Sequence, residues 1–214
     1  MAWLESGRIV GNFAGALRSW VIELPQRLYW EVRDLLSPWR ETPQSDAIRF
    51  RVLFVCFGNI CRSPLAEQVF RQKLANIGLA SVVGVDSAAT SSWNIGNRPH
   101  WKARACAARH GLKIGHLRAR LFTRVDFGRF DRIVVMDRGN REDVLRLAID
   151  PESPARVGLL LDFAGGGEIP DPIYGDVAEF EKVFHQISAG CEGLVADVAR
   201  EVERRATNAA NPSP

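Results

Sequence analysis

The sequence of 214 residues is short of cysteine, of long apolar runs and of net charge, and each shortage excludes a class of protein. Its four cysteines form no Cys-x-x-Cys pair and its four histidines are scattered, so neither a disulfide framework nor a zinc site is indicated. No apolar stretch approaches the roughly 20 residues of a membrane helix, and the N-terminus lacks the apolar core of a signal peptide. A net charge of +3 is too small to indicate a nucleic-acid partner. We expect a cytoplasmic chain in a reducing compartment, without metal or other cofactor.

Residues 1–47 differ from the rest of the chain in the spacing of their apolar residues. Apolar residues recur there at helical spacing in two groups, which are Phe13, Leu17, Trp20, Val21 and Leu24, and then Leu28, Val32, Leu35 and Leu36. Pro25 separates the two patterns, and residues 42–45 read as a linker. We interpret residues 1–47 as an amphipathic helical extension and linker. Intramolecular or homodimer packing is favoured over peripheral membrane contact, because the polar face carries charges of both signs.

From residue 48 onward the pattern alternates between strands and helices. Short apolar runs at 51–55, 82–85, 132–136 and 157–161 predict buried strands, and residues 63–76, 98–110, 140–148 and 176–204 predict helices. This alternation indicates an α/β fold with a parallel sheet and helices on both faces, whose ligands bind at the carboxyl ends of the strands. We predict one domain over residues 48–205 and a flexible tail over 206–214.

The residues that carry chemistry follow the first predicted strand. The segment reads Cys56-Phe57-Gly58-Asn59-Ile60-Cys61-Arg62-Ser63-Pro64. Five residues between a cysteine and an arginine can curl so that their backbone N–H groups face one point, and the following helix adds its positive end. Arg62 can bind two phosphate oxygens and keeps its charge. The segment predicts a phosphate-binding loop, and the lack of Gly-Lys-Ser or Gly-Lys-Thr excludes a nucleotide P-loop.

The same loop suits a nucleophilic cysteine. Thiols at helix N-termini beside cations ionise readily, so Cys56 is expected to attack phosphorus as a thiolate. Ser63 can donate a hydrogen bond to that thiolate, and Asn59 suits a left-handed turn. The alternative is that Cys56 is a buried core cysteine, which would be favoured if the cysteine stood alone.

The segment resembles the signature of low-molecular-weight protein tyrosine phosphatases. The likeness continues through residues 86–93, 135–140 and 171–175 and covers residues 48–204. The resemblance implies a four-stranded parallel sheet and hydrolysis of protein phosphotyrosine through a phospho-cysteine on Cys56, without metal. It places the general acid at Asp171, which by itself would read as a turn residue before Pro172. For a bacterial source it also suggests a tyrosine autokinase as partner.

The resemblance assigns substrate contacts to the loop residues Phe57, Gly58, Asn59, Ile60, Cys61 and Ser63, and aromatic pocket walls to Trp93 and Tyr174. Core packing is the alternative for Trp93. Asp137 reads either as support for the site or as a turn residue.

Three positions depart from the family pattern. Ile173 stands where an aromatic residue usually follows Asp-Pro, and Phe57 replaces a common leucine, so we expect Phe57 to restore part of the pocket wall. Leu117 occupies the position of a histidine that usually supports the loop. Either His116, one residue earlier, reaches in, or this support is missing.

Three alternative functions fit the sequence less well. An arsenate reductase needs a thiol relay, but Cys106 and Cys191 lie on different predicted helices. An arginine phosphatase commonly has threonine at the position of Ile60. A silent phosphotyrosine-binding module would not need a nucleophile, a phosphate clamp and an acid together.

Overall fold

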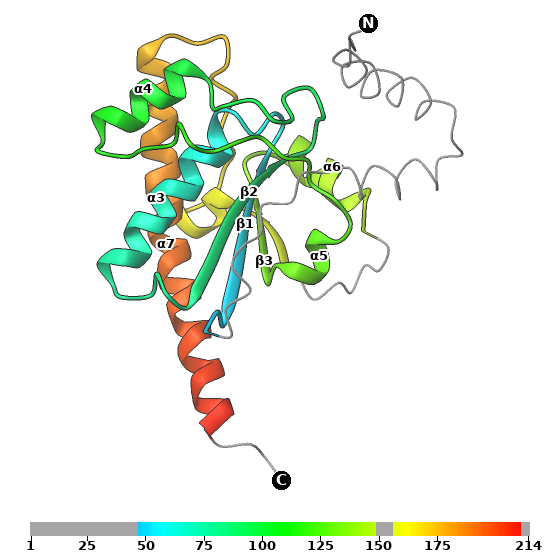
Figure 1. Ribbon diagram of the computed structural model, residues 1–214, viewed down its shortest axis with the longest axis vertical. Coiled ribbons are helices and arrows are strands. Elements are labelled where there is room, and N and C mark those ends of the chain that lie inside the picture. The colour runs from blue at the N-terminus through cyan, green and yellow to red at the C-terminus, as the bar shows by residue number, and fades with distance from the viewer. Residues whose placement is uncertain (1–46, 149–155, 211–214) are drawn as a thin grey trace, which may run out of the picture. The chain divides into compact units, whose positions relative to one another are not determined.

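The computed structural model describes residues 47–148 and 156–210 and contains one β-sheet with helices on both faces (Figure 1). Along the chain the elements are β1 (Phe50–Cys56), α3 (Arg62–Asn76), β2 (Val83–Ala89), α4 (Trp101–Arg109), α5 (Asp126–Arg129), β3 (Arg132–Val135), α6 (Arg138–Leu145), β4 (Arg156–Leu159), the 3-10 helix η2 (Leu160–Ala164) and α7 (Val177–Ala210). The predicted helical extension lies outside the described residues, apart from Ala47. None of the described helices is long and apolar enough to cross a membrane.

The sheet has the strand order β2-β1-β3-β4, and every neighbouring pair is parallel. Strand β1 lies between β2 and β3, where Val52 pairs with Val85 on one side and with Arg132 on the other. A strand with neighbours on both sides and helices on both faces is buried throughout, which explains its nearly continuous apolar sequence. The predicted four-stranded parallel sheet is confirmed.

Alternate residues of β1 point to opposite faces of the sheet. Val52, Phe54 and Cys56 belong to one hydrophobic core together with buried side chains of α3, α4 and α7. Leu53 and Val55 are also fully buried, and they point to the other face, where α5 and α6 lie (Figure 1). Because both faces are covered, the carboxyl edge of the sheet is the place where polar groups can meet a ligand.

Helix α7 packs closely against η2 because two of its residues have no side chain. A Cβ atom at Gly193 would overlap the carbonyl oxygen of Phe163, and one at Gly190 would lie 2.8 Å from the carbonyl oxygen of Leu160. The segment after η2 then returns to the sheet, where the N–H of Ile169 donates to the carbonyl oxygen of Met136 at 2.8 Å. This contact brings the chain that leads to Asp171 to the carboxyl edge of the sheet.

Three elements differ from the expected ones. Strand β4 ends at Leu159, because η2 starts at the next residue. Helix α5 was not predicted, since four residues are too few for a periodic pattern. Helix α7 continues to Ala210, so residues 206–210 of the predicted tail are helical. Arg205 stabilises this end, since it pairs with Glu201 one turn earlier and with Asp131 outside the helix.

Candidate active site

The loop between β1 and α3 presents its carbonyl oxygens to the surrounding protein. The carbonyl of Cys56 accepts from the N–H of Thr90, that of Phe57 from the N–H of Ser91, and that of Ile60 from the N–H of His100, at 2.8–2.9 Å. Within the described residues, no backbone N–H group of residues 57–61 donates a hydrogen bond. Because buried N–H groups are seldom left unpaired, these donors are available to an anion.

Asn59 organises the loop. Its φ of 51° lies in the left-handed region, as its residue type predicts. Its side-chain Nδ2 donates to the hydroxyls of Ser63 at 2.8 Å and Ser87 at 2.9 Å, and its Oδ1 accepts from the N–H of Arg120 at 3.0 Å. The buried amide therefore connects the loop to the start of α3, to β2 and to the segment before α5.

The hydroxyl of Ser63 is directed at Cys56. The Ser63 Oγ lies 3.1 Å from the Cys56 Sγ and 3.4 Å from the carbonyl oxygen of Ala88. Since Ser63 already accepts a hydrogen bond from Asn59, its own proton is free to be donated. The shorter contact favours donation to the sulfur, which stabilises a thiolate and would also stabilise it as a leaving group.

Arg62 joins the loop to two distant carboxylates. Its Nη1 donates to Asp137 Oδ2 and, at 3.0 Å, to the carbonyl oxygen of Ile169, while its Nη2 donates to Asp171 Oδ2 at 2.7 Å. Burial opposes its charge, but the negative charges of Cys56, Asp171 and Asp137 outweigh burial and raise the pKa of Arg62. Its Nε is buried without a hydrogen-bond partner among the described residues. Three of the five guanidinium N–H groups are used in these bonds, so the Nε–H and the second Nη2–H are left for an oxyanion.

The carboxylates of Asp137 and Asp171 differ in how firmly hydrogen bonds hold them. Asp137 is the N-cap of α6 and accepts from the N–H of Asn140 at 2.6 Å as well as from Arg62, so it combines the two interpretations, a residue of the turn and a contact of the loop arginine. Asp171 has a side chain that is 36% exposed, and its one other hydrogen bond within the described residues comes from the N–H of Ile173, at 3.2 Å. It follows Gly165, Gly166 and Gly167, which all have positive φ. Asp171 can therefore exchange partners, whereas Asp137 is fixed.

Phe57 and Trp93 form an aromatic pair beside the loop. Their ring centroids lie 5.8 Å apart in an edge-to-face arrangement with an interplanar angle of 82°. Trp93 is 82% exposed, so the alternative of core packing is wrong. Tyr174 is 98% exposed, and Ile173 packs partly against the hydrophobic core. The structure brings Phe57 and Trp93 together and leaves Tyr174 in solvent.

In the part of the chain that the structure describes, neither of the two positions considered for a supporting histidine side chain supplies one to this loop. His116 is exposed, whereas Leu117 is buried in the hydrophobic core. The hydroxyl of Ser87 instead donates to Glu67 Oε2 at 2.7 Å, and the buried Glu67 also accepts from Arg71 at 3.2 Å. The loop is thus supported by an acid that sequence reasoning missed. The sequence feature that could have revealed this acid is a glutamate on the apolar face of a predicted helix, four residues before an arginine.

The remaining cysteines have different surroundings. Cys61 is buried in the loop, and burial, together with the charges of Cys56 and Asp171, raises its pKa. The thiols of Cys106 and Cys191 contact the carbonyl oxygens of Phe180 and Ala66, respectively. In the described part of the chain, the one group of three metal-ligating side chains, which includes Cys106, lies between α4 and α7.

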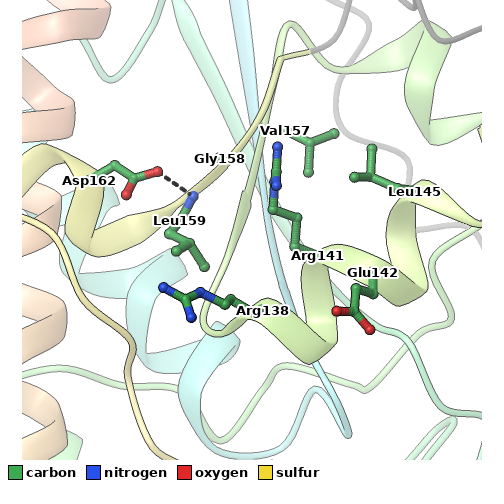
Figure 2. A pocket seen from close by; sticks show the side chains of 8 residues that line it. All are labelled: Arg138, Arg141, Glu142, Leu145, Val157, Gly158, Leu159 and Asp162. Carbon is green, nitrogen blue, oxygen red and sulfur yellow. Dashed lines mark hydrogen bonds between the residues drawn. The ribbon is translucent and has the colours of Figure 1, made fainter.

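A groove of about 350 Å³ lies elsewhere, between α6 and β4 (Figure 2). Arg138, Arg141, Leu145 and Val157 are among its lining residues. None of the predicted site residues lines it.

Comparison with known proteins agrees with this geometry. The sequence profile of the family described as Low molecular weight phosphotyrosine protein phosphatase matches residues 51–204. The chain is 41% identical over 162 residues to a low molecular weight protein-tyrosine-phosphatase of Streptomyces coelicolor, covering 73% of this chain and 98% of that protein. It is 40% identical to the human low molecular weight phosphotyrosine protein phosphatase, covering 67% of this chain and 92% of that protein.

The fold is similar to a crystal structure of a protein tyrosine phosphatase from Entamoeba histolytica. The TM-score is 0.68 at 30% identity, covering 71% of this chain and 98% of that one. The chain therefore belongs to the low molecular weight phosphotyrosine protein phosphatase family, and it is a protein-tyrosine-phosphatase of the kind that hydrolyses phosphotyrosine through a cysteine intermediate.

Proposed function

We propose that Cys56 is the nucleophile of phosphotyrosine hydrolysis, that Arg62 holds the phosphoryl oxygens, and that Asp171 is the general acid and base. The observation that carries this assignment is the buried guanidinium of Arg62. It follows Cys56 in the loop, donates to Asp171 and keeps a buried Nε without a partner among the described residues. The contact between Arg62 and Asp171, which are 109 positions apart, supports a site that combines the clamp, the acid and the loop that carries Cys56.

In the first step, the Cys56 thiolate attacks phosphorus. The sulfur–phosphorus bond forms, the bond from phosphorus to the phenolic oxygen breaks, and Asp171 gives its proton to that oxygen. For this, Asp171 must be protonated and leave the guanidinium. A phosphoryl oxygen that binds to Nη2 takes the place of the carboxylate there, which is consistent with the exposure of Asp171 and the glycines before it.

In the second step, Asp171 acts as a base. It removes a proton from a water molecule, the water oxygen bonds to phosphorus, and the sulfur–phosphorus bond breaks. The products are inorganic phosphate and the Cys56 thiolate, to which Ser63 can donate a hydrogen bond across the 3.1 Å contact. Each turnover consumes one water molecule and restores the resting enzyme.

We propose that the loop residues Phe57, Gly58, Asn59, Ile60, Cys61 and Ser63 form the phosphate cradle. The unpaired N–H groups of residues 57–61 support this assignment. The edge-to-face pair of Phe57 and Trp93 supports a wall for the phenyl ring of the substrate. Tyr174 is assigned to the entrance, since its side chain is almost fully exposed.

Steady-state kinetics test the assignment. The full chain is assayed with phosphotyrosine peptide, phosphoserine peptide, phosphoarginine and p-nitrophenyl phosphate. We expect turnover of phosphotyrosine and the aryl phosphate, its abolition by Cys56→Ser, and loss of both binding and turnover with Arg62→Ala. Turnover that survives Cys56→Ser, or a preference for phosphoarginine, contradicts the proposal.

We also propose a domain over residues 48–205 that acts in the cytoplasm on phosphotyrosine proteins, with a tyrosine autokinase as the opposing enzyme if the source is bacterial. The family match over residues 51–204 supports the boundaries. The four free cysteines support a reducing compartment. Fractionation of cells settles the location, and phosphotyrosine on the kinase should accumulate when Cys56→Ser replaces the wild type.

A further inference from the structure

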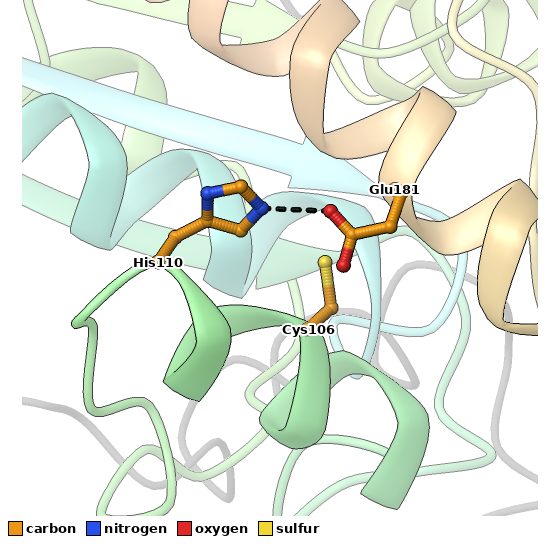
Figure 3. A group of neighbouring side chains, drawn as sticks. All are labelled: Cys106, His110 and Glu181. Carbon is orange, nitrogen blue, oxygen red and sulfur yellow. Dashed lines mark hydrogen bonds and ion pairs between the residues drawn. The ribbon is translucent and has the colours of Figure 1, made fainter.

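Helices α4 and α7 bring together three side chains that the phosphatase chemistry does not use. Cys106 and His110 stand four positions apart on one face of the chain that forms α4 and its C-terminal cap, and Glu181 lies near the start of α7 (Figure 3). Their sulfur, nitrogen and carboxylate oxygen atoms all lie within 4.8 Å of one another. Figure 3 shows the three side chains directed toward a common point.

The three side chains are held in this arrangement by the surrounding protein. The ring of His110 stacks on Phe184 with a centroid distance of 3.7 Å and an interplanar angle of 12°. Its Nε2 lies 2.7 Å from Glu181 Oε2. Cys106 is fully buried, and its sulfur makes a weak contact of 3.6 Å to the carbonyl oxygen of Phe180. Few side-chain movements are therefore needed to place all three around one ion.

Within this group of three side chains, Glu181 already pairs with a cationic side chain, that of Arg109. Arg109 Nε donates to Glu181 Oε1 at 2.6 Å, whereas His110 contacts the other carboxylate oxygen, Oε2. Burial opposes the charge of Glu181, but the hydrogen bonds from His110 and Arg109 outweigh burial and lower the pKa of this carboxyl. Glu181 is thus an anion at neutral pH, and a metal ion would compete with Arg109 for it.

We propose that Cys106, His110 and Glu181 form a binding site for a thiophilic divalent ion of the Zn²⁺ class, separate from the active site. A thiolate, an imidazole and a carboxylate are the ligand types that zinc sites use, at distances of about 2.0–2.3 Å. Mg²⁺ and Ca²⁺ prefer sets of oxygen ligands, so they should not compete. Three protein ligands leave a fourth tetrahedral position for water.

Zinc binds cysteine as a thiolate, so the Cys106 thiol releases its proton to water when the ion binds. The other titratable groups beside the site are Arg109, which pairs with Glu181, and His185, which lies beside the ring of His110.

The test uses Co²⁺ as a spectroscopic substitute for Zn²⁺ in the full chain without a histidine tag. Cys56→Ser serves as the background, because the nucleophile itself could bind metal. We expect a sulfur-to-cobalt charge-transfer absorption in this background, its loss when Cys106→Ser is added, and an affinity at least tenfold lower with His110→Ala or Glu181→Gln. Arg109→Ala should strengthen binding, since it removes the competing cation.

Zn²⁺ should displace Co²⁺ and raise the Tm of the Cys56→Ser protein, and this rise should be absent with Glu181→Gln. His110 and Glu181 are partly exposed, so their variants test the site even if Cys106→Ser fails to fold. Absence of the absorption at millimolar Co²⁺ overturns the proposal. So does an affinity that is unchanged by both His110→Ala and Glu181→Gln.

Discussion

Asp171 Oδ2 accepts a hydrogen bond of 2.7 Å from Arg62 Nη2, although the two residues are 109 positions apart. The same guanidinium is fixed on its other side by Asp137 and by the carbonyl oxygen of Ile169. Because Asp137 also caps α6, the guanidinium has one rigid partner and one exchangeable partner. A phosphoryl group that binds to Arg62 can therefore release Asp171 for proton transfer while the clamp stays in place.

Asp171→Asn should lower kcat by about 10²–10⁴-fold, because the amide cannot transfer a proton. Inhibition by inorganic phosphate should change little, since Arg62 and the loop remain. The loss should be greatest for alkyl phosphates, whose leaving groups are the poorest. Rates measured over a series of leaving groups check this expectation.

Glu168→Gln is the matched control for Asp171→Asn. Glu168 lies three residues earlier, is partly exposed and pairs with Arg138 rather than with Arg62. Its kinetics should resemble those of the wild type. If Asp171→Asn hydrolyses alkyl phosphates as fast as the wild type, another group is the acid.

The sequence predicted those features of the molecule that depend on neighbouring residues. Local geometry alone indicates a phosphate loop where an apolar strand ends in a cysteine that is followed, after five residues, by an arginine. The left-handed φ of Asn59 follows from its residue type. Asp171 required the family resemblance, because its pairing with Arg62 spans most of the domain. The carbonyl oxygen of Ile169 could not be predicted, since any residue supplies one.

The sequence did not determine which side chains support the loop between β1 and α3. The sequence allowed His116 to reach the loop, but the structure exposes His116 and buries Leu117. Which of two adjacent residues faces the core depends on the exact path of the irregular segment after α4, and no periodicity describes such a path. Ser87 and Glu67 became recognisable as supports only when β2 and α3 were placed beside the loop.

Phe57→Ala should raise KM for aryl phosphates by about two- to tenfold, the value of one aromatic contact. KM for small alkyl phosphates should stay the same, because they have no ring to pack against Phe57 and Trp93. Ile77→Ala is the control, since this exposed side chain lies at the C-terminal end of α3, away from the loop, and should leave both KM values unchanged. Equal changes for aryl and alkyl substrates would show that Phe57 shapes the loop rather than the pocket wall.

Cys61 should protect Cys56 from irreversible oxidation. Peroxide oxidises the Cys56 thiolate to a sulfenic acid, the Cys61 thiol attacks that sulfur with loss of water, and a thiol reductant reopens the disulfide. The raised pKa keeps Cys61 as a thiol, so peroxide reacts first with Cys56.

Activity after peroxide and then dithiothreitol checks this role. The wild type should recover, whereas Cys61→Ser should lose activity permanently. Cys191→Ser is the control. Cys191 is buried on α7, where its thiol contacts the carbonyl oxygen of Ala66 on α3. If the Cys61→Ser variant regained its full activity, Cys61 would not protect Cys56, and its role would be packing within the loop.

Residues 1–46 should be dispensable for catalysis. Among the described residues the first strand begins at Phe50, and the family match begins at residue 51, so neither includes residues 1–46. Truncation should keep p-nitrophenyl phosphate turnover within a few-fold of the full chain. It should also change the oligomeric mass in light scattering, or the binding to anionic vesicles if these residues contact membranes. A truncated protein that does not fold would assign the segment to the core.

Asn59→Gly and Asn59→Ala separate the two contributions of Asn59 to the loop. Both variants remove the hydrogen bonds to Ser63, Ser87 and Arg120, so both should lower kcat/KM for p-nitrophenyl phosphate and weaken inhibition by phosphate. Only alanine also opposes the φ of 51°, at a cost of about 1–2 kcal/mol, whereas glycine adopts this conformation freely. Alanine should therefore be about tenfold more damaging than glycine if the loop must keep this turn to bind phosphate. Equal values of kcat/KM for the two variants would mean that the turn contributes nothing beyond the hydrogen bonds. Wild-type kinetics for Asn59→Gly would mean that the hydrogen bonds contribute nothing, and the loop would then be held by its backbone contacts alone.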